Sequence, residues 1–441
     1  MKRLLSLLLC AVLALFCATT AQAAGVSITL TASEYALHYA FDAGAQDPFV
    51  ILEYATPAEK GWMMLYSEDG HFEGDVSLAY SGAGGKTSVA LTSARTTGSI
   101  GKASTTLPKA ADYQKPTGQS NAKVTDFMLT ETPEGFHYAF NAAGTDYMLL
   151  YWRSKEQTVT QPVYPDENGH YEGDVVSELT FARTQFTVQV KSGSGSMKKE
   201  ATVRKGYQAP EAPQRQEGRL SGVTVCIDAG HQENGRFVNE PIGPGLSGST
   251  SGKGGMAQGT KTNRRESIVC LEIGMLLRDE LLRQGANVVM TREDQTTFHT
   301  NIERCEIAEA GGAQIMLRLH CNNSSNRSKR GIQVYGPLNS DYAKAVADAD
   351  TYREMGQKLL DAMKTRVGMT LANSTGMVRL NDNYVGNNWA KMMCFLVEMG
   401  YLSNPAEEYL LVTPVYQQWL AEGMADGVYE IAVARGWVQA Q

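Results

Sequence analysis

The hydrophobic pattern of the chain changes between its two halves. In the first half, short runs of alternating apolar and polar residues, such as "FHYAF" and "FTVQV", are separated by Gly, Asp and Asn. This period of two is typical of β-strands with one buried face. In the second half, longer apolar runs alternate with stretches in which apolar residues recur at helical spacing. The pattern therefore predicts an all-β region followed by an α/β region.

The β-rich half contains two copies of one motif. The stretch "ALHYAFDA" (36–43) returns as "GFHYAFNA" (135–142), and "YSEDGHFEGDVSL" returns as "YPDENGHYEGDVVSEL". Short strands at this spacing are typical of β-sandwiches. We therefore predict two tandem sandwich-like repeats, at 24–115 and 123–207. The Pro-, Gln- and charge-rich segment that follows, 208–219, has no apolar period and is the predicted linker.

Histidines recur at matched positions of the two repeats. His38 matches His137, and His71 matches His170. Such residues are most often strand and turn positions that determine the fold, but two equivalent metal or ligand sites would give the same recurrence. The alternating aromatic residues beside them are typical of a strand core, although they would also suit stacking on sugar rings.

The second half has the pattern of an α/β domain. Apolar strands are predicted at "VTVCI", "NVVMTR", "QIMLRLH" and "MMCFLV". Apolar residues at helical spacing predict helices at 266–284 and 351–368, and an exposed helix at 414–436 closes the region. This alternation predicts a central, mainly parallel sheet flanked by helices, in a domain that spans 220–437.

The first residues have the pattern of a secretory signal. Lys2 and Arg3 precede an apolar run that ends at Cys17, and the small residues "AQA" end at Ala23. The apolar run is shorter than the roughly 20 residues that a membrane span needs. We therefore predict a signal peptide at 1–23 and a secreted, extracytoplasmic protein. Cleavage there changes the formal net charge from −7 to −9, and neither a nucleic-acid partner nor a further membrane segment is indicated.

The cysteine pattern argues against a disulfide scaffold. Five cysteines remain after such cleavage, all in the second half: Cys226, Cys270, Cys305, Cys321 and Cys394. Their number is odd and their spacing is not that of a small stapled domain. We predict buried free thiols that pack as small apolar residues.

Residues with metal-binding or acid/base chemistry follow three of the predicted strands. His231 comes shortly after "VTVCI", His320 ends "QIMLRLH", and Glu398 follows "MMCFLV". Sites in α/β sheets form beyond the carboxyl ends of the strands, so these side chains are expected to converge. Glu266 opens a helix at the same edge. Two imidazoles and a carboxylate with one open position form a catalytic zinc site.

Further residues are candidates for support of this site. Glu398 would be a carboxylate that binds no metal and transfers protons, and Asp228 is placed to orient a ligand from behind. Asn322, two residues after His320, would support the ligands or contact a substrate. Arg379, in "MVRLNDN", is either a contact for a substrate carboxylate or a surface arginine.

The second half resembles a known enzyme family. The segments "IDAGH", "TRE", "ERCEIAEAGGAQIMLRLHCNN" and "FLVEMGYLSNPAEEYLL" make residues 221–436 similar to the zinc-dependent N-acetylmuramoyl-L-alanine amidases. A longer loop that contains "EPIGPG" also occurs in that family. The resemblance implies one Zn²⁺ held by His231, Glu266 and His320, and Glu398 as the catalytic acid/base.

The function implied by this resemblance is that of an exported, cell-wall-associated peptidoglycan hydrolase. It would cleave the amide between N-acetylmuramic acid and the L-alanine of the stem peptide by zinc-activated water. Two other functions stay open: a zinc hydrolase for another peptide amide, and a wall-binding protein with a degenerate hydrolase domain. Whether the N-terminal repeats bind wall polymers or act as a spacer is also left open.

Overall fold

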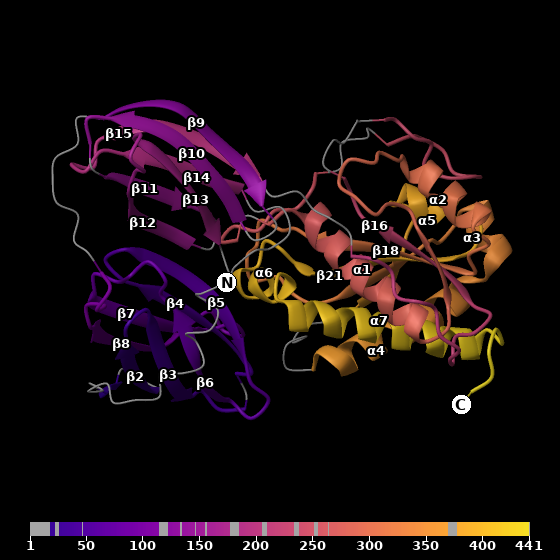
Figure 1. Ribbon diagram of the computed structural model, residues 1–441. Coiled ribbons are helices and arrows are strands. Elements are labelled where there is room, and N and C mark those ends of the chain that lie inside the picture. Colours follow the sequence, from indigo (N-terminus) through magenta and orange to yellow (C-terminus); the bar gives the residue numbers. More distant parts are fainter. Residues whose placement is uncertain are drawn as a thin grey trace. The chain divides into compact units, whose positions relative to one another are not determined.

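The computed structural model divides the chain into two compact units, Met1–Gly206 and Tyr207–Gln441 (Figure 1). The N-terminal unit consists of strands, and the C-terminal unit combines strands with helices. The structure describes residues 18–22, 26–45, 47–113, 122–132, 135–145, 147–154, 157–176, 185–204, 210–232, 238–250, 255–262, 264–368 and 377–440.

The N-terminal unit is built from three antiparallel sheets. A four-stranded sheet has the order β1-β2-β3-β6, a three-stranded sheet the order β13-β10-β9, and an eight-stranded sheet the order β15-β14-β11-β12-β5-β4-β7-β8. Strand β1 (Ala18–Gln22) precedes the first repeat, whose strands are β2 (Ser27–Ser33), β3 (Ala36–Asp42), β4 (Phe49–Ala55), β5 (Glu59–Tyr66), β6 (His71–Ser77), β7 (Gly85–Ser93) and β8 (Ser99–Leu107). Those of the second are β9 (Lys123–Thr132), β10 (Gly135–Ala143), β11 (Met148–Arg153), β12 (Gln157–Val163), β13 (His170–Val176), β14 (Gln185–Lys191) and β15 (Met197–Arg204).

Each repeat has its own hydrophobic core, but the two repeats share one sheet. The inward residues of β2, β3 and β6 pack on those of β4, β7 and β8 in the first repeat, and an equivalent aromatic-rich core lies in the second. Strands β5 and β12 pair antiparallel, from Gln157↔Gly61 to Val159↔Glu59, and so join the repeats edge to edge. The β-rich first half therefore agrees with the prediction, and the shared sheet makes it one unit. The predicted boundaries at 24–115, 123–207 and 208–219 stay predictions.

Part of the predicted signal peptide has regular structure. Ala18–Gln22 forms β1, which pairs antiparallel with β2, while the rest of that prediction lies outside the described residues. Cleavage after Ala23 would remove β1 and leave β2, β3 and β6 as a three-stranded sheet. No helix within the described residues is long and apolar enough to cross a bilayer.

The C-terminal unit is an α/β domain around a six-stranded mixed sheet, with the order β17-β16-β18-β21-β19-β20. These strands are β16 (Thr224–Ala229), β17 (Asn287–Met290), β18 (Ile315–Asn322), β19 (Gln333–Gly336), β20 (Met377–Leu380) and β21 (Met393–Tyr401). Strands β17, β16, β18 and β21 are parallel to one another, as predicted, whereas β19 pairs antiparallel with β21 and parallel with β20. The short strands β19 and β20 were not predicted, so the α/β class is confirmed while the sheet is mixed rather than simply parallel.

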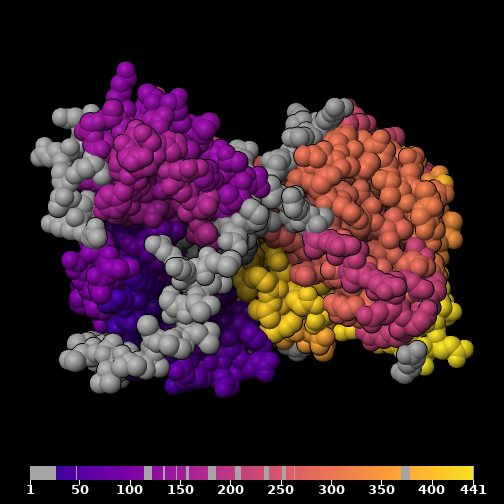
Figure 2. All heavy atoms as spheres, in the orientation of Figure 1, coloured from indigo at the N-terminus to yellow at the C-terminus, as the bar shows by residue number. Residues whose placement is uncertain are grey.

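Helices cover both faces of this sheet. The helices are α1 (Glu266–Arg283), α2 (Asn301–Ala310), α3 (Asp341–Val346), α4 (Ala349–Val367), α5 (Val385–Trp389), α6 (Pro405–Leu411) and α7 (Pro414–Ala434). Helices α1 and α4 pack on one face, with α7 against both, and α2 and α5 cover the other face (Figure 1). The heavy-atom view shows each unit closely filled on its visible side (Figure 2).

Helix α7, the linker segment and the cysteines were each given a predicted environment. Helix α7 was expected to be exposed, but residues on several of its sides are buried, among them Tyr416, Leu420 and Ile431. The part of the predicted linker that the structure describes contains no helix or strand, and it is hydrogen-bonded to the end of α1, as from Gln216 N–H to the Leu282 carbonyl at 3.0 Å. The five cysteines are buried free thiols, as predicted.

Candidate active site

Three of the predicted residues converge at one edge of the sheet. His231 follows β16, Glu266 is the first residue of α1, and His320 lies near the end of β18. The Glu266 carboxylate lies 3.1 Å from Nε2 of His231 and 3.0 Å from Nδ1 of His320. The metal-binding atoms of the three residues all lie within 4.8 Å of one another. The fold therefore brings together side chains that are far apart in the sequence.

Glu266 is held in place by the loop that precedes α1. Its carboxylate accepts hydrogen bonds from the backbone N–H groups of Ala257 at 2.7 Å and Cys321 at 3.1 Å. That loop is in turn fixed by Glu408 of α6, which is fully buried and accepts hydrogen bonds from the backbone of Thr260, Lys261 and Thr262. Helix α6 therefore fixes the loop that holds the Glu266 carboxylate at the start of α1.

The turn that carries His231 is tightly constrained. His231 has φ 57°, a left-handed conformation that is uncommon outside glycine. A Cβ at Gly230 would lie 2.4 Å from the Leu319 carbonyl and 2.6 Å from the His320 ring, so only glycine allows this close approach. The buried guanidinium of Arg292 donates to the carbonyls of Ala229 at 2.7 Å and Gly230 at 2.8 Å. It thereby fixes the backbone that leads into the metal-binding imidazole.

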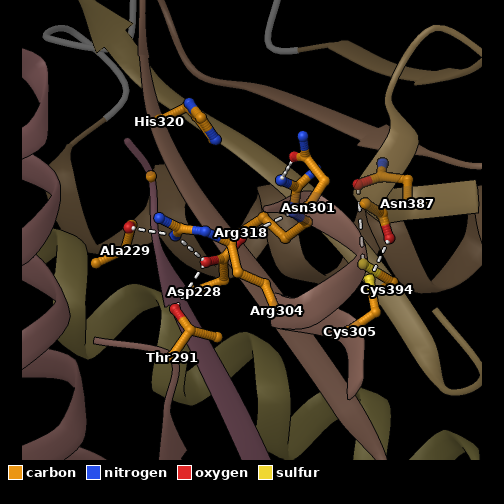
Figure 3. Close-up of polar contacts among 12 residues, drawn as sticks. Asp228, Ala229, Thr291, Asn301, Arg304, Cys305, Arg318, His320, Asn387 and Cys394 are labelled. Atoms are coloured by element: carbon orange, nitrogen blue, oxygen red, sulfur yellow. Dashed lines mark hydrogen bonds and ion pairs between the residues drawn. The ribbon is translucent and has the colours of Figure 1, made fainter. Parts of the chain in front are cut away.

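Asp228 lies behind the site and contacts no imidazole directly (Figure 3). Its carboxylate is fully buried and accepts hydrogen bonds from Thr291 Oγ1 at 2.8 Å, Arg304 Nη1 at 2.5 Å and Arg318 Nε at 2.9 Å. Burial alone would raise the pKa of Asp228, but the charges of Arg304 and Arg318 outweigh it and lower that pKa well below its usual value. Arg304 also donates to the His231 carbonyl at 3.1 Å. Asp228 therefore reaches His231 through Arg304 and the backbone.

Glu398 lies beside this cluster on the neighbouring strand β21, inside the strand rather than after it. Strand β21 continues to Tyr401, and Glu398 pairs in register with His320 on one side and Gln333 on the other. Burial, and then the charge of Glu266, raise the pKa of Glu398 to about 8. Its Oε2 atom is buried without a hydrogen-bond partner among the described residues. A carboxyl group in this state is suited to proton transfer near neutral pH.

A cavity of about 600 Å³ connects these groups. His231, Glu266, His320 and Glu398 line it together with Asn322, whose Nδ2 donates to Gln333 Oε1 at 3.1 Å. Arg379 is exposed on β20, and the described residues that line the cavity do not include it. Asn322 is therefore among the described residues that line the cavity, and Arg379 is not.

Several residues that shape the site were not assigned a role from the sequence. They are Gly230, Glu240, Arg292, Arg304 and Glu408. Glu240, in the "EPIGPG" loop, is buried and accepts hydrogen bonds from Asn301 Nδ2 at 2.6 Å and Ile302 N–H at 2.8 Å at the start of α2. The partners of these residues lie about 60 to 150 positions away in the sequence, so the local pattern did not mark them.

The donor set fits a zinc ion. Zinc ligands must be deprotonated. Burial lowers the pKa of His320, and hydrogen bonds to His231 and His320 outweigh burial to lower that of Glu266. The Nε2 atom of His320 is also buried without a hydrogen-bond partner among the described residues.

Known proteins resemble the C-terminal half of the chain. The family model described as N-acetylmuramoyl-L-alanine amidase matches residues 225–430. The chain is 26% identical over 231 residues to the germination-specific N-acetylmuramoyl-L-alanine amidase of Bacillus subtilis, covering 49% of this chain and 83% of that protein. It is 27% identical over 218 residues to the probable cell wall amidase LytH of Staphylococcus aureus, covering 48% of this chain but only 60% of LytH.

Solved structures of low identity also match this half of the chain. The catalytic domain of CwlV, an N-acetylmuramoyl-L-alanine amidase from Bacillus (Paenibacillus) polymyxa var. colistinus, is 24% identical, with a TM-score of 0.37 and coverage of 49% of this chain and 99% of that one. The N-acetylmuramyl-L-alanine amidase Ami1 of Mycobacterium smegmatis is 17% identical, with a TM-score of 0.42 and coverage of 49% of this chain and 100% of that one. The family of this half of the chain is therefore assigned from the family model and the sequence relatives, and not from these structures. Residues 225–430 of the chain belong to the N-acetylmuramoyl-L-alanine amidase family.

Proposed function

We propose that this protein is an exported amidase that hydrolyses peptidoglycan between N-acetylmuramic acid and the L-alanine of the stem peptide. Family membership supports the reaction class. The observation that carries the proposal is the convergence of His231, Glu266 and His320 on a cavity that also contains Glu398. This set combines a metal site with a separate proton-transferring carboxyl group.

His231, Glu266 and His320 would hold one zinc ion. A bound zinc ion supplies Lewis acidity, which polarises the amide carbonyl and lowers the pKa of water towards neutrality. Arg292 and Gly230 keep the His231 turn in position, and the Ala257 and Cys321 amides keep the Glu266 carboxylate in position. The ligands are thus arranged before a substrate arrives, which is what electrostatic stabilisation of a transition state requires.

Glu398 would transfer the proton. An amide nitrogen leaves poorly unless it is protonated, so hydrolysis needs a group that takes a proton from the attacking water and donates it to the amine. Glu398 is the cavity carboxyl whose Oε2 atom is available for this, since the Glu266 carboxylate is engaged by imidazoles and backbone amides. Asn322, which lines the same cavity, would orient a substrate, and Asp228 would stabilise the turn at His231 through Arg304.

The location of action follows from the leader and the substrate. Peptidoglycan lies outside the cytoplasmic membrane, and the basic start, apolar run and "AQA" of residues 1–23 would direct export. The protein would then act as a secreted or cell-wall-associated enzyme.

Digestion of purified peptidoglycan tests the proposal. We expect wild-type protein loaded with zinc to release stem peptides with free L-alanine amino termini, and a chelator to abolish this. The Glu398→Ala variant should retain zinc but release none. Glu354→Ala, which removes an exposed carboxylate of α4, should behave as wild type. Release of peptides with other amino termini would instead favour a different amide as substrate, and zinc-loaded protein that releases none would contradict the proposal.

A further inference from the structure

The two β-repeats carry matched groups of histidines and carboxylates on a solvent-facing side of their sheets. Side chains two residues apart lie on the same face of a strand, and directly opposite residues of antiparallel strands are neighbours. In the first repeat, β3 and β6 pair in the register His38↔Asp75, Ala40↔Glu73 and Asp42↔His71. The small Ala40 opposite Glu73 leaves room for both imidazoles to approach that carboxylate. The side chains of His38, His71 and Glu73 are 36%, 50% and 59% exposed.

The two imidazoles of the first repeat are oriented in the same way. The Nδ1 atom of His38 lies 3.1 Å from Asp75, and the Nδ1 atom of His71 lies 2.7 Å from Asp42. Their Nε2 atoms both face the Glu73 carboxylate, at 3.3 and 3.7 Å. Glu73 thus lies between two imidazoles whose outer nitrogens are already engaged.

The second repeat contains the same arrangement. The register on β10 and β13 is His137↔Asp174, Ala139↔Glu172 and Asn141↔His170. The Nε2 atoms of His137 and His170 lie 3.2 and 3.8 Å from the two oxygens of Glu172. The Nδ1 atom of His137 lies 2.9 Å from Asp174, and that of His170 lies 2.8 Å from Oδ1 of Asn141.

Asn141 determines which nitrogen of His170 carries the proton. Its Nδ2 donates to Asp126 Oδ2 at 2.9 Å, so its Oδ1 must accept from Nδ1–H of His170. The carboxylates beside the other histidines also demand a proton on Nδ1. In the neutral imidazoles, Nε2 is then an acceptor that faces the acceptor oxygens of Glu73 or Glu172. Two acceptors at this distance repel each other unless a proton or a metal cation lies between them.

We propose that each repeat binds a divalent transition-metal ion, such as Zn²⁺, through His38, His71 and Glu73 in the first and His137, His170 and Glu172 in the second. Imidazole with carboxylate is a ligand set for zinc. A carboxylate or amide oxygen on Nδ1–H is the usual partner of a metal-binding histidine. Within the described residues, the carboxylates of these groups form ion pairs with the histidines alone. Their negative charge would therefore favour a cation.

The geometry indicates that these sites close as an ion binds. Two ligands of a tetrahedral zinc at about 2.0–2.1 Å lie about 3.3 Å apart, which matches the shorter imidazole–carboxylate distance in each repeat. The two imidazoles face different oxygens of the carboxylate, so the group is more open than the one formed by His231, Glu266 and His320. Ion binding must draw the second imidazole inward, and we expect a weaker site than the catalytic one.

Zinc stoichiometry of the full-length, tag-free chain tests this proposal. After equilibration with zinc chloride at pH 7.5, we expect three ions per chain in wild type. Glu73→Gln should bind two, and the double variant Glu73→Gln/Glu172→Gln should bind one. A glutamine amide would donate to the imidazole acceptors and keep the sheet folded. Glu53→Gln, which removes an exposed carboxylate elsewhere in the first repeat, is the matched control and should still bind three.

The difference in bound zinc between wild type and the double variant tests this proposal independently of the enzyme's function. A loss of two ions supports it, even if the remaining ion is also missing and the catalytic zinc proposal fails. Equal ion counts in wild type and the double variant would overturn the proposal. Each carboxylate would then be paired with protonated imidazoles and not with a metal ion. Zinc should also raise the melting temperature of the N-terminal unit in wild type but not in the double variant.

Discussion

The chain contains two kinds of histidine–glutamate–histidine group, and they are built in opposite ways. In the α/β unit, His231, Glu266 and His320 come from three distant segments, and their mostly buried side chains line one cavity. In the β-repeats, such as at His38 and Glu73, the group follows from the register of two paired strands and lies open to solvent. The same residue types are therefore found in a preorganised site and in an exposed one.

The difference lies in what surrounds each group. Behind the buried site, Asp228, Arg292, Arg304 and Glu408 hold the backbone that carries the ligands, and all four are nearly inaccessible to water. The exposed groups are supported by the strand ladder and by a carboxylate or amide on each imidazole. Burial makes electrostatic interactions strong and raises the energetic cost of breaking them. We therefore expect mutations to have large effects in the first case and small effects in the second.

Replacement of Glu398 by Gln should have the largest effect. Gln keeps the shape of the side chain but cannot transfer a proton, so the rate of amide hydrolysis should fall by roughly 10²- to 10⁴-fold. Bound zinc and the unfolding curve should remain as in wild type. Glu354→Gln is the control, and a Glu398→Gln variant with undiminished activity would exclude the proton-transfer role.

Replacement of Asp228 by Asn should destabilise the α/β unit by about 3–5 kcal/mol, because two buried arginines lose their counter-ion. Denaturant unfolding monitored in that unit would measure this. The comparison variant Asp75→Asn, at an exposed carboxylate, should leave unfolding of the β-unit unchanged in the absence of metal. Equal effects would contradict the distinction between the buried and the exposed groups.

The same carboxylate predicts a pH dependence. The pKa of Asp228 is lowered on folding, so its contribution to stability is present above its unfolded pKa of about 4 and is lost as the pH falls further. Wild-type protein should therefore lose stability in the α/β unit below about pH 4. Asp228→Asn should lack this part of the acid dependence, and identical acid profiles would argue against the ion pairs with Arg304 and Arg318.

Replacement of Gly230 by Ala should have a smaller effect that is confined to the metal site. The new Cβ would press on the Leu319 carbonyl and the His320 ring, at a cost of about 1–3 kcal/mol. Zinc affinity should fall with it. Gly44→Ala, at a turn with φ 82° and open space around its Cβ, would introduce only backbone strain and should leave zinc binding at His231 unchanged. A loss of zinc in both variants would indicate a general rather than a local effect.

The sequence by itself determined which residue types stand at strand ends, the two β-repeats and the change to an α/β domain. These features depend on local periodicity, so His231, His320 and the first turn at Glu266 were recognisable before any contact was known. The buried free cysteines followed in the same way from their number and spacing.

The tertiary structure alone decided how distant segments meet. It placed Glu398 within β21 rather than after it, paired β19 antiparallel to β21, joined the repeats through β5 and β12, and buried several sides of α7. It also brought Arg304 and Arg318 onto Asp228 and left Arg379 outside the cavity. Alternation of apolar residues along a strand or helix specifies which face is buried but not its partner. The partner is chosen by packing and charge compensation between segments that the linear pattern cannot relate.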